Sequence, residues 1–293
     1  METATSDLVT GLKALADPVR VRLAALCSAG EASVSELTEV LGLSQPRVSQ
    51  HLKTLVDAGL IERFRDGHFV YYRVPQRSSG LARRLLSLLP RDEPEFGRDL
   101  ARLQRLRGDT AGARPRGPDD ADRALHRALI ALTVATPLGD LLDIGCGQGR
   151  ILKLLASRAQ RAVGVDIDAD ARRFARAQLL LAGIPNCTLR QGDMYALPFA
   201  DGEFDTVILD DVLGSADRPL DALAEAARLL QHGGRLLLLQ SLSASEGDAL
   251  RTACADWCRA AGLRLSPPRT IPVRAPRWLL AVATPADTSS AAA

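Results

Sequence analysis

Three acidic residues and three glycines form one pattern, because they follow short apolar runs in the second half of the chain. In chain order they are Asp143, Gly145, Gly147, Gly149, Asp166 and Asp193. Glycine at a strand-to-helix turn lets the backbone approach a ligand closely. A carboxylate at the end of the next strand, about twenty residues later, can accept hydrogen bonds from both hydroxyls of a ribose. The pattern predicts a nucleoside-binding site.

The glycine spacing differs from that of two familiar phosphate-binding turns. The dinucleotide fingerprint needs a glycine at position 150, where Arg150 stands, and no Gly-Lys-Ser/Thr sequence follows the turn. Taken singly, a glycine-rich turn is also compatible with a plain tight turn, and a strand-end aspartate with a helix cap. Only the order of the elements points to one ligand site.

A second group of polar side chains lies on a helix expected between Ser44 and Gly59. Val48, Leu52 and Leu55 recur at helical spacing and are expected to face a core. The side chains that then point outward are Gln45, Arg47, Ser49, Gln50 and Lys53. Arginine and glutamine suit paired contacts to base edges, and serine and lysine suit phosphates.

A hairpin is expected over residues 60–74, where Asp66-Gly67 separates two aromatic-rich runs. Its polar side chains, predicted to contact the DNA backbone or the minor groove, are Arg63, Arg65, His68 and Arg73. Positive charge thus gathers on one helix and one hairpin, although the net charge of the chain is only +2. The alternative is a small helical interaction domain whose polar face is solvated.

The elements before this hairpin fit a winged helix-turn-helix. Helices are expected over 7–16, 18–27 and, after a cap at Ser33 or Ser35, up to Leu41. After the hairpin, residues 78–107 show helical spacing at Leu81, Leu85 and Leu88, with a break at Pro90. Residues 108–118 are rich in Gly, Pro and Arg and are the expected linker.

From residue 119 a helix precedes apolar runs that alternate with helical stretches. This order predicts an α/β fold with a doubly wound, Rossmann-like parallel sheet covered on both faces. Two final strands are expected at an antiparallel edge. The predicted domains are 1–77 (DNA binding), 78–118 (dimerisation helix and linker), 119–284 (cofactor binding) and a disordered tail at 285–293.

Composition is that of an ordinary globular chain of 293 residues, with 46% hydrophobic and 25% charged residues. No segment resembles a membrane span or a secretory signal, so we expect a cytoplasmic protein without membrane contact. The chain has five cysteines, an odd number, and they are scattered along the sequence. This fits a reducing compartment rather than a framework of disulfides. Cys254 and Cys258 lie one helical turn apart. A half-buried helix face beside Trp257 is favoured over a metal or redox pair, because no further ligands cluster nearby.

Residues 7–77, with the run SELTEVLGLSQPRVSQHLKTLVDAGLI, resemble the ArsR family of bacterial winged-helix repressors. The resemblance implies a homodimer, paired through the first helix and the helix after the wing, on a two-fold symmetric double-stranded DNA operator. The stripe of leucines after the wing is consistent with such a dimer face. Many family members sense metals through two cysteines. Ser33 and Ser35 occupy those positions here, so no metal site is expected there.

Residues 120–284, with DIGCGQGR at the glycine turn, resemble class I S-adenosylmethionine-dependent methyltransferases. The resemblance implies S-adenosylmethionine or S-adenosylhomocysteine as ligand. Its methionine part and sugar would lie along Asp143, Gly145, Gly147 and Gly149, with Asp166 on the ribose hydroxyls and Ile167 against the adenine. The adenine edge would meet Asp193 and Met194, and the methionine amino group would approach Asp210.

Three functions remain open at this point. The two halves together resemble S-adenosylhomocysteine-responsive regulators of the methionine and S-adenosylmethionine cycle, in which the ligand is an effector. An active methyltransferase is less favoured, because the fourth strand ends in LDDVLGS without an Asn/Asp-Pro-Pro-aromatic motif, and the cysteines lack the spacing of arsenite methyltransferases. No catalytic residue is predicted, since Asp211 suits either a base or a helix cap. The intact glycine and aspartate set argues against a mere scaffold.

Overall fold

The structure is a computed structural model that describes residues 5–66, 69–75, 80–89, 92–110, 119–242, 247–274 and 276–286. The hairpin turn with His68, the linker from 111 onward and the tail from 287 lie outside the described residues. The chain divides into two compact units. One comprises residues 1–114 with 173–188, and the other comprises 115–172 with 189–293. The predicted domain boundaries stay predictions.

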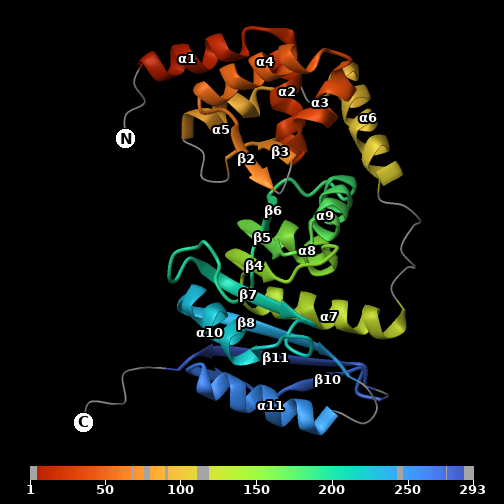
Figure 1. Ribbon diagram of the computed structural model, residues 1–293, viewed down its shortest axis with the longest axis vertical. Helices are drawn as coiled ribbons and strands as arrows, with labels where there is room; N and C mark the ends of the chain where they lie inside the picture. Colours follow the sequence, from red (N-terminus) through yellow and green to blue (C-terminus); the bar gives the residue numbers. More distant parts are fainter. Residues whose placement is uncertain are drawn as a thin grey trace. The chain divides into compact units, whose positions relative to one another are not determined.

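The first unit opens with four helices (Figure 1): α1 (Thr5–Leu15), α2 (Pro18–Ala29), α3 (Val34–Leu41) and α4 (Gln45–Asp57). Of the two caps considered for α3, Ser33 is the one used, since its hydroxyl accepts from the Glu36 N–H and the Glu36 side chain accepts from the Ser33 N–H. Gly42 ends α3 at φ 66°, a left-handed conformation that favours glycine. The turn then leads directly into α4, as a helix-turn-helix requires.

A three-stranded sheet follows, with the order β1-β3-β2. Its strands are β1 (Ala32–Ser33), β2 (Glu62–Asp66) and β3 (Phe69–Arg73), and β2 and β3 form the expected antiparallel wing. Two helices complete this part of the unit, α5 (Gly80–Ser87) and α6 (Pro94–Thr110). Pro90, where a break was predicted, lies outside the described residues.

The leucine stripe after the wing is not one continuous exposed face. Leu85 is 4% exposed and belongs to the core of its own unit, whereas Leu88 is 76% exposed. A Cβ added at Gly11 of α1 would come 2.4 Å from Leu85 Cδ1, so α5 packs closely against α1. Burial against α1 therefore removes Leu85 from the surface that the sequence assigned to dimer contact.

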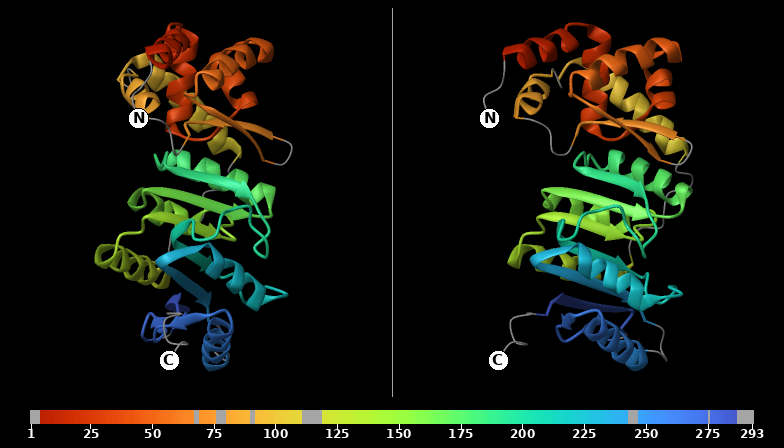
Figure 2. Two further views of the ribbon diagram at one scale, coloured as in Figure 1. Left: turned by 90° about the vertical axis from the view of Figure 1, so that its left-hand side faces the viewer. Right: turned by 60° about the vertical axis from the view of Figure 1, so that its left-hand side comes forward.

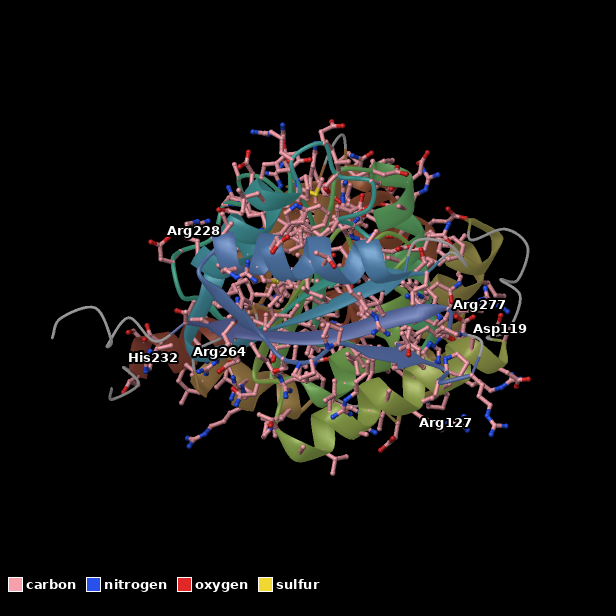
Figure 3. All side chains as sticks on the ribbon, turned by 90° about the horizontal axis from the view of Figure 1, so that it is seen from below. Asp119, Arg127, Arg228, His232, Arg264 and Arg277 are labelled. Atoms are coloured by element: carbon pink, nitrogen blue, oxygen red, sulfur yellow. The ribbon has the colours of Figure 1, made fainter. Side chains whose placement is uncertain are left out.

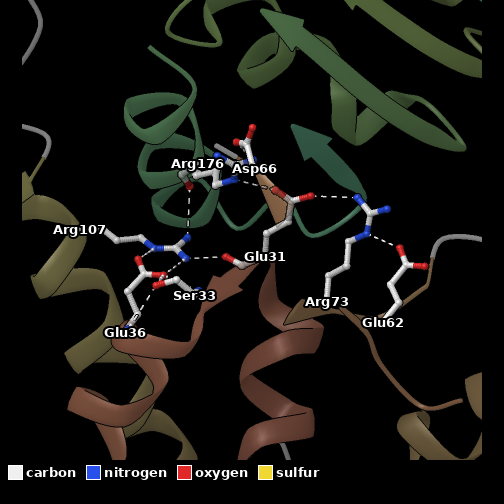
Figure 4. A network of polar contacts seen from close by, with 8 residues as sticks. All are labelled: Glu31, Ser33, Glu36, Glu62, Asp66, Arg73, Arg107 and Arg176. Carbon is white, nitrogen blue, oxygen red and sulfur yellow. Dashed lines mark hydrogen bonds and ion pairs between the residues drawn. The ribbon is translucent and has the colours of Figure 1, made fainter. Parts of the chain in front are cut away.

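A buried ion-pair network joins several elements of the first unit (Figure 4). Glu31 accepts from Arg73 Nη1 at 2.9 Å and from Arg176 Nε at 2.8 Å. Arg107 binds Glu36, with 2.6 Å between Nε and Oε1, and its Nη2 also donates to the Glu31 carbonyl oxygen. These guanidinium groups neutralise the carboxylates, because a buried carboxylate without a charged partner would destabilise the fold.

Arg176 explains why residues 173–188 belong to the first unit. Its Nη2 lies 2.7 Å from Asp66 Oδ2, and its guanidinium lies 4.1 Å from the centre of the Tyr71 ring. Leu180, which is 4% exposed, joins the same hydrophobic core. The sequence contains no local signal for this assignment, because the partners lie more than a hundred residues apart.

The large sheet has the strand order β10-β11-β8-β7-β4-β5-β6, with β9 also paired to β11. Its strands are β4 (Asp140–Ile144), β5 (Arg161–Asp166), β6 (Cys187–Gln191), β7 (Phe204–Asp210), β8 (Leu230–Ser241), β9 (Leu263–Leu265), β10 (Arg269–Ile271) and β11 (Trp278–Pro285). Pairing is parallel from β5 through β4 and β7 to β8, and antiparallel at β11. Three strands occupy the end where two were predicted, because Pro267 and Pro268 divide residues 263–271 into β9 and β10.

Helices cover both faces of this sheet, as the sequence predicted. They are α7 (Asp120–Ala135), α8 (Arg150–Leu155), the 3₁₀ turn η1 (Ala156–Arg158), α9 (Ala169–Leu181), α10 (Pro219–Leu229) and α11 (Gly247–Ala260). α10 and α11 lie on one face and α7 on the other (Figures 2 and 3). Asp119 caps α7 and also binds Arg277 next to β11, and Figure 3 shows the two residues side by side.

No helix in the described ranges combines the length and the apolar character that a membrane crossing requires.

Candidate functional site

The strand order places a switch point between β4 and β7. The chain passes from β4 to β5 and β6 on one side, then returns to β7 and β8 on the other side. In open α/β sheets, ligands bind at the carboxyl ends of the strands where the order reverses in this way. Asp143, the glycine turn and Asp210 all lie there, although the sequence placed them only at separate strand ends.

The glycine turn needs its glycines for two different reasons. Gly145, Gly147 and Gly149 all have positive φ, at 70°, 50° and 78°. A Cβ at Gly145 would come 2.5 Å from Val212 Cγ2, so packing excludes a side chain. A Cβ at Gly147 would meet nothing within 4 Å, so that side of the backbone is open to a ligand.

Asp166 ties this turn to two neighbouring loops. Its Oδ2 accepts from the Gly147 N–H at 2.7 Å, and its Oδ1 accepts from the Asp168 N–H at 2.8 Å. Its carbonyl oxygen accepts from the Gly192 N–H at 3.2 Å. The structure therefore brings the glycine turn, the end of β5 and the loop before Asp193 together.

The predicted adenine-side residues differ in exposure. Ile167 is 71% exposed, although it is a large apolar side chain. Asp193 is exposed and accepts from the Tyr195 N–H at 3.1 Å, while Met194 packs partly against the core of the second unit. Ile167 and Asp193 thus present surface to a ligand, and Met194 does so only in part.

A polar cluster adjoins the turn at the ends of β4 and β7. Asp143 is 1% exposed, and neither of its carboxylate oxygens has a hydrogen-bond partner. Burial, and then the neighbouring Asp210, raises the pKa of Asp143 well above its ordinary value. Arg150 Nη2 donates to both oxygens of Asp210, at 2.7 and 2.9 Å. Burial raises the pKa of Asp210, and Arg150 opposes that rise.

Sequence reasoning missed two members of this cluster. Arg150 was noted only because it stands where the dinucleotide fingerprint needs a glycine, and Trp278, whose ring centre lies 4.6 Å from the Arg150 guanidinium, was not considered. Trp278 begins β11, so no spacing rule connects it to the turn. The only available signal was the charge of Arg150 directly after a turn that binds ligands.

The raised pKa of Asp143 has a measurable consequence for stability. A carboxyl whose folded pKa exceeds its unfolded pKa stabilises the fold at low pH, and that contribution is lost as pH rises through the folded pKa. We expect Asp143→Asn, which cannot ionise, to raise the thermal transition of the second unit at pH 8 by a few degrees. The difference should shrink on acidification to about pH 4.

The measurement uses tryptophan fluorescence, because Trp257 and Trp278 both lie in the second unit. Asp170→Asn, at an exposed carboxylate on α9, serves as the control. If the difference in thermal transition temperature between wild type and Asp143→Asn is the same at pH 4 and pH 8, the prediction is contradicted.

The helix α4 presents the arrangement expected of a recognition helix. Val48, Leu52 and Leu55 are fully buried, which confirms the predicted inward face. Of the outward set, Ser49 is half-buried, and the exposed members are Gln45, Arg47, Gln50 and Lys53. The wing adds Arg63 and Arg65, both exposed on β2.

The structure corrects the prediction that Arg73 contacts DNA. Its side chain is 6% exposed, and it binds Glu31 and Glu62, with Nε 2.5 Å from Glu62 Oε1. Its guanidinium also lies 4.6 Å from the centre of the Phe64 ring. Both carboxylates neutralise Arg73 inside the unit, so it is not available to a phosphate.

The cysteine pair on α11 is part of a packed face. Burial raises the pKa of Cys254 to about 11, and burial with Cys254 nearby raises the pKa of Cys258 to about 12. Cys258 is fully buried in the core of the second unit, against which Trp257 packs. In the ranges that the structure describes, no three His, Cys, Asp or Glu side chains gather as a metal site would require.

A cavity of about 700 Å³ opens beside the ends of β7 and β8. Its polar lining includes Asp211, Ser215, Gln240 and Ser241, and Trp257 lies on the α11 side. Asp211 accepts from the Ser241 N–H at 2.9 Å and from its hydroxyl at 2.8 Å. Asp211 therefore links the end of β7 to β8. It does not cap α10, whose N-cap position is occupied by Arg218 without a side-chain capping hydrogen bond.

Comparisons with known proteins match both halves of the chain. The family model described as bacterial regulatory protein, arsR family, matches residues 17–63, and the model described as methyltransferase domain matches residues 142–238. The arsenic resistance transcriptional regulator ArsR1 of Pseudomonas putida is 36% identical over 108 residues, which cover 36% of this chain and 80% of that protein.

Two further proteins are similar to part of this chain. An uncharacterized 37.1 kDa protein in transposon TN4556 of Streptomyces fradiae is 35% identical over 122 residues, which cover 41% of this chain and only 35% of that protein. A solved S-adenosylmethionine-dependent methyltransferase from Clostridium acetobutylicum shares the fold at a TM-score of 0.50 and 12% identity, with 58% of this chain and 94% of that chain covered. The chain belongs to the ArsR family of bacterial regulatory proteins, and a class I methyltransferase domain follows its ArsR-type helix-turn-helix.

Proposed function

We propose that this protein is a DNA-binding transcriptional repressor whose methyltransferase domain binds S-adenosylhomocysteine or S-adenosylmethionine as an effector, and that it controls genes of the methionine and S-adenosylmethionine cycle. One observation carries the proposal: a helix-turn-helix of ArsR type and a nucleoside site of methyltransferase type stand in one chain. The glycine turn, open at Gly147, gives that site room for a ligand.

The residues of the second unit fit an adenosyl ligand. Asp166 would bind the ribose hydroxyls, and the exposed Ile167 would lie against the adenine, whose edge would meet Asp193 and Met194. Asp143 carries two buried oxygens without partners, which the polar part of such a ligand can satisfy. An effector role requires only binding, and no catalytic step.

The first unit supplies the proposed DNA contacts and the proposed dimer face. Base contacts fall to Arg47 and Gln50 on α4, and phosphate contacts to Arg65 on β2. The dimer face would include an exposed apolar patch on α1, formed by Leu8, Val9 and Leu12 at 38–49% exposure. A paired first helix fits the two-fold operator expected of an ArsR protein.

Arg47 offers a direct test of DNA recognition. A duplex selected by the wild-type protein from a random pool provides the probe. Arg47→Ala should weaken binding to that duplex by about ten- to hundredfold and relax the sequence preference at one base pair. Arg65→Ala should instead weaken binding to all sequences alike and lower the salt slope by about one.

Arg105→Ala, which removes an exposed arginine from α6, is the matched control and should leave the affinity unchanged. An unaltered affinity in Arg47→Ala would remove α4 from the DNA interface.

The effector proposal is tested by measuring both ligand binding and DNA binding. Calorimetry of the full chain with S-adenosylhomocysteine and with S-adenosylmethionine is followed by DNA-binding titrations with and without each ligand. A ligand shifts DNA affinity only if it binds the two protein states differently. We expect one ligand to change the affinity for the selected duplex at least about fivefold. Ligand binding with unchanged DNA affinity would overturn the effector role.

An active methyltransferase is the second candidate, and the cavity lined by Asp211 and Gln240 favours it. A cavity of about 700 Å³ suits a small acceptor, and the buried Gln240 Nε2 has no hydrogen-bond partner. Incubation with S-adenosylmethionine and extracts of small metabolites, followed by measurement of S-adenosylhomocysteine production, tests this activity. Turnover without any effect on DNA binding would favour the enzyme over the regulator.

A further inference from the structure

The chain passes from the second unit into the first within a single helix, α9. Residues up to Arg172 belong to the second unit, and residues 173–188 belong to the first. Arg172, Arg176 and Leu180 are spaced four residues apart, so they follow one another along one face of the helix. Their exposed fractions are 1%, 5% and 4%. One continuous helix therefore carries buried side chains of both units on the same face.

The first turn of α9 is held by the strand-end aspartate of the nucleoside site. Arg172 Nη1 donates to the Asp166 carbonyl oxygen at 2.8 Å, and the Asp168 N–H donates to Asp166 Oδ1 at 2.8 Å. The Asp168 carbonyl oxygen accepts from the Arg172 N–H at 3.2 Å. Ribose hydroxyls on the Asp166 carboxylate would share or replace the hydrogen bond from Asp168. Ligand binding at Asp166 therefore changes the contacts that hold the start of α9.

One turn further along α9, Arg176 binds the wing. Its Nη2 lies 2.7 Å from Asp66 Oδ2 at the end of β2, and its guanidinium lies 4.1 Å from the centre of the Tyr71 ring on β3. Its Nε donates to Glu31 Oε2 at 2.8 Å, and Glu31 also binds Arg73 of β3 (Figure 4). A single side chain of α9 therefore contacts both strands of the wing.

Arg176 is also connected to the helix-turn-helix. Its carbonyl oxygen accepts from Arg107 Nη1 at 3.4 Å, and Arg107 binds Glu36 of α3, the helix before the recognition helix α4. On the wing, Asp66 directly follows Arg65, the proposed phosphate contact. A displacement of Arg176 would thus reach both elements that carry the proposed DNA contacts. Close-packed interiors change between discrete arrangements, so a small displacement at one end of a buried helix reaches its other end.

We propose that α9 couples the ligand site to DNA binding, and that the pair of Arg176 and Asp66 is the contact through which the ligand acts on the wing. Ligand binding at Asp166 changes the start of α9, and the helix transmits this change to β2 and β3. Such coupling requires that the ligand stabilise one arrangement of α9 and the wing over another. This inference rests on the proposed function, because it names the route by which the effector alters DNA affinity.

The test measures a coupling factor, the ratio of the affinities of the full-length protein for the selected duplex with and without ligand. S-adenosylhomocysteine and S-adenosylmethionine are used separately, and the ligand with the larger factor is kept. The wild-type factor should be about fivefold or more. Because coupling is reciprocal, the duplex should change the affinity for the ligand by the same factor. A wild-type protein without coupling would overturn both this proposal and the effector function.

A combined variant, Arg176→Met with Asp66→Asn, removes the pair without leaving either charge buried alone, since Glu31 keeps Arg73. Its coupling factor should fall below about twofold, while its affinity for the ligand without DNA should change less than about threefold. A uniform change in DNA affinity cancels in the ratio. Arg173→Met, at an exposed arginine of the same helix, is the matched control and should keep the wild-type factor.

Two results would overturn the proposal and leave the effector function standing. The first is a wild-type coupling factor in the folded combined variant. The second comes from hydrogen exchange of the wild-type protein, which needs no variant and decides the matter if the combined variant does not fold. Ligand should change amide protection in α9 beyond residue 173 and in β2 and β3. A change confined to the glycine turn and the end of β5 would show that α9 does not transmit ligand binding.

Discussion

Replacement of Asp166 by alanine is expected to weaken S-adenosylhomocysteine binding by at least about hundredfold, or ~3 kcal/mol. Its carboxylate holds the Gly147 N–H at 2.7 Å and the Asp168 N–H at 2.8 Å, and so organises the glycine turn before a ligand arrives. The same carboxylate is the proposed acceptor for two ribose hydroxyls. Each hydrogen bond to a charged group contributes about 1.5–3 kcal/mol, and alanine removes both.

Isothermal calorimetry measures this loss, and Asp166→Asn refines it. The amide keeps one acceptor oxygen, so its affinity should fall between those of the wild type and the alanine variant. Asp170→Ala removes an exposed carboxylate from the first turn of α9 and should bind normally. If Asp166→Ala retains wild-type affinity while remaining folded, the ligand is not bound through a ribose at this strand end.

Replacement of Arg107 by methionine is expected to destabilise the first unit by about 3–5 kcal/mol at pH 7. The Arg107 side chain is 5% exposed and binds Glu36 through two nitrogens, at 2.6 and 3.1 Å. Without Arg107, the Glu36 carboxylate on α3 would lose its guanidinium partner. Hydrogen exchange in the α3 and α6 segments reports the free energy of opening of this unit separately from the other.

The loss should depend on pH in a defined direction. Burial alone would raise the pKa of Glu36, but Arg107 and Ser33 hold that pKa below its ordinary value of 4.5. A depressed carboxyl pKa stabilises the fold above the unfolded pKa, and this contribution is lost as pH falls through the folded pKa. The difference in the free energy of opening between wild type and Arg107→Met should therefore be largest near neutrality. It should become smaller below about pH 4.5.

Arg105→Met removes an exposed arginine from the same helix and should leave the stability almost unchanged. A loss of equal size in Arg105→Met would show that helix α6 itself, and not the ion pair, is responsible. A constant gap from pH 7 to pH 3 for Arg107→Met would contradict the role of Glu36.

Most elements could be predicted because their signals are local. Ser33 caps α3 and Gly42 ends it through contacts within a few residues. The buried parallel strands read as apolar runs because helices cover both faces. The last segment was harder to predict, because strands as short as β9 and β10 leave little pattern around Pro267 and Pro268. Hence two strands were predicted where three exist.

Some site residues were predictable from local sequence, and others were placed by partners distant in the chain. Asp166 and the glycine turn were predictable, because a strand, a turn and a second strand follow each other in one βαβ unit. Arg73 could not be placed correctly, since its position in the wing suggests exposure while its partner Glu31 lies far away in the sequence. Arg150 and Trp278 are brought together only by the sheet, at 4.6 Å from the guanidinium to the ring centre.

The sequence by itself determined the two kinds of domain, the recognition helix with its buried face, and the strand-end positions of Asp143, Asp166 and Asp210. These depend on period, capping and turn chemistry, which act over a few residues. Only the tertiary structure decided which charges are neutralised and which are open. Burial, ion pairing and unsatisfied hydrogen bonds depend on partners that are distant in the chain. Arg73 is buried and paired with Glu31, whereas Nη1 of Arg150 has no hydrogen-bond partner.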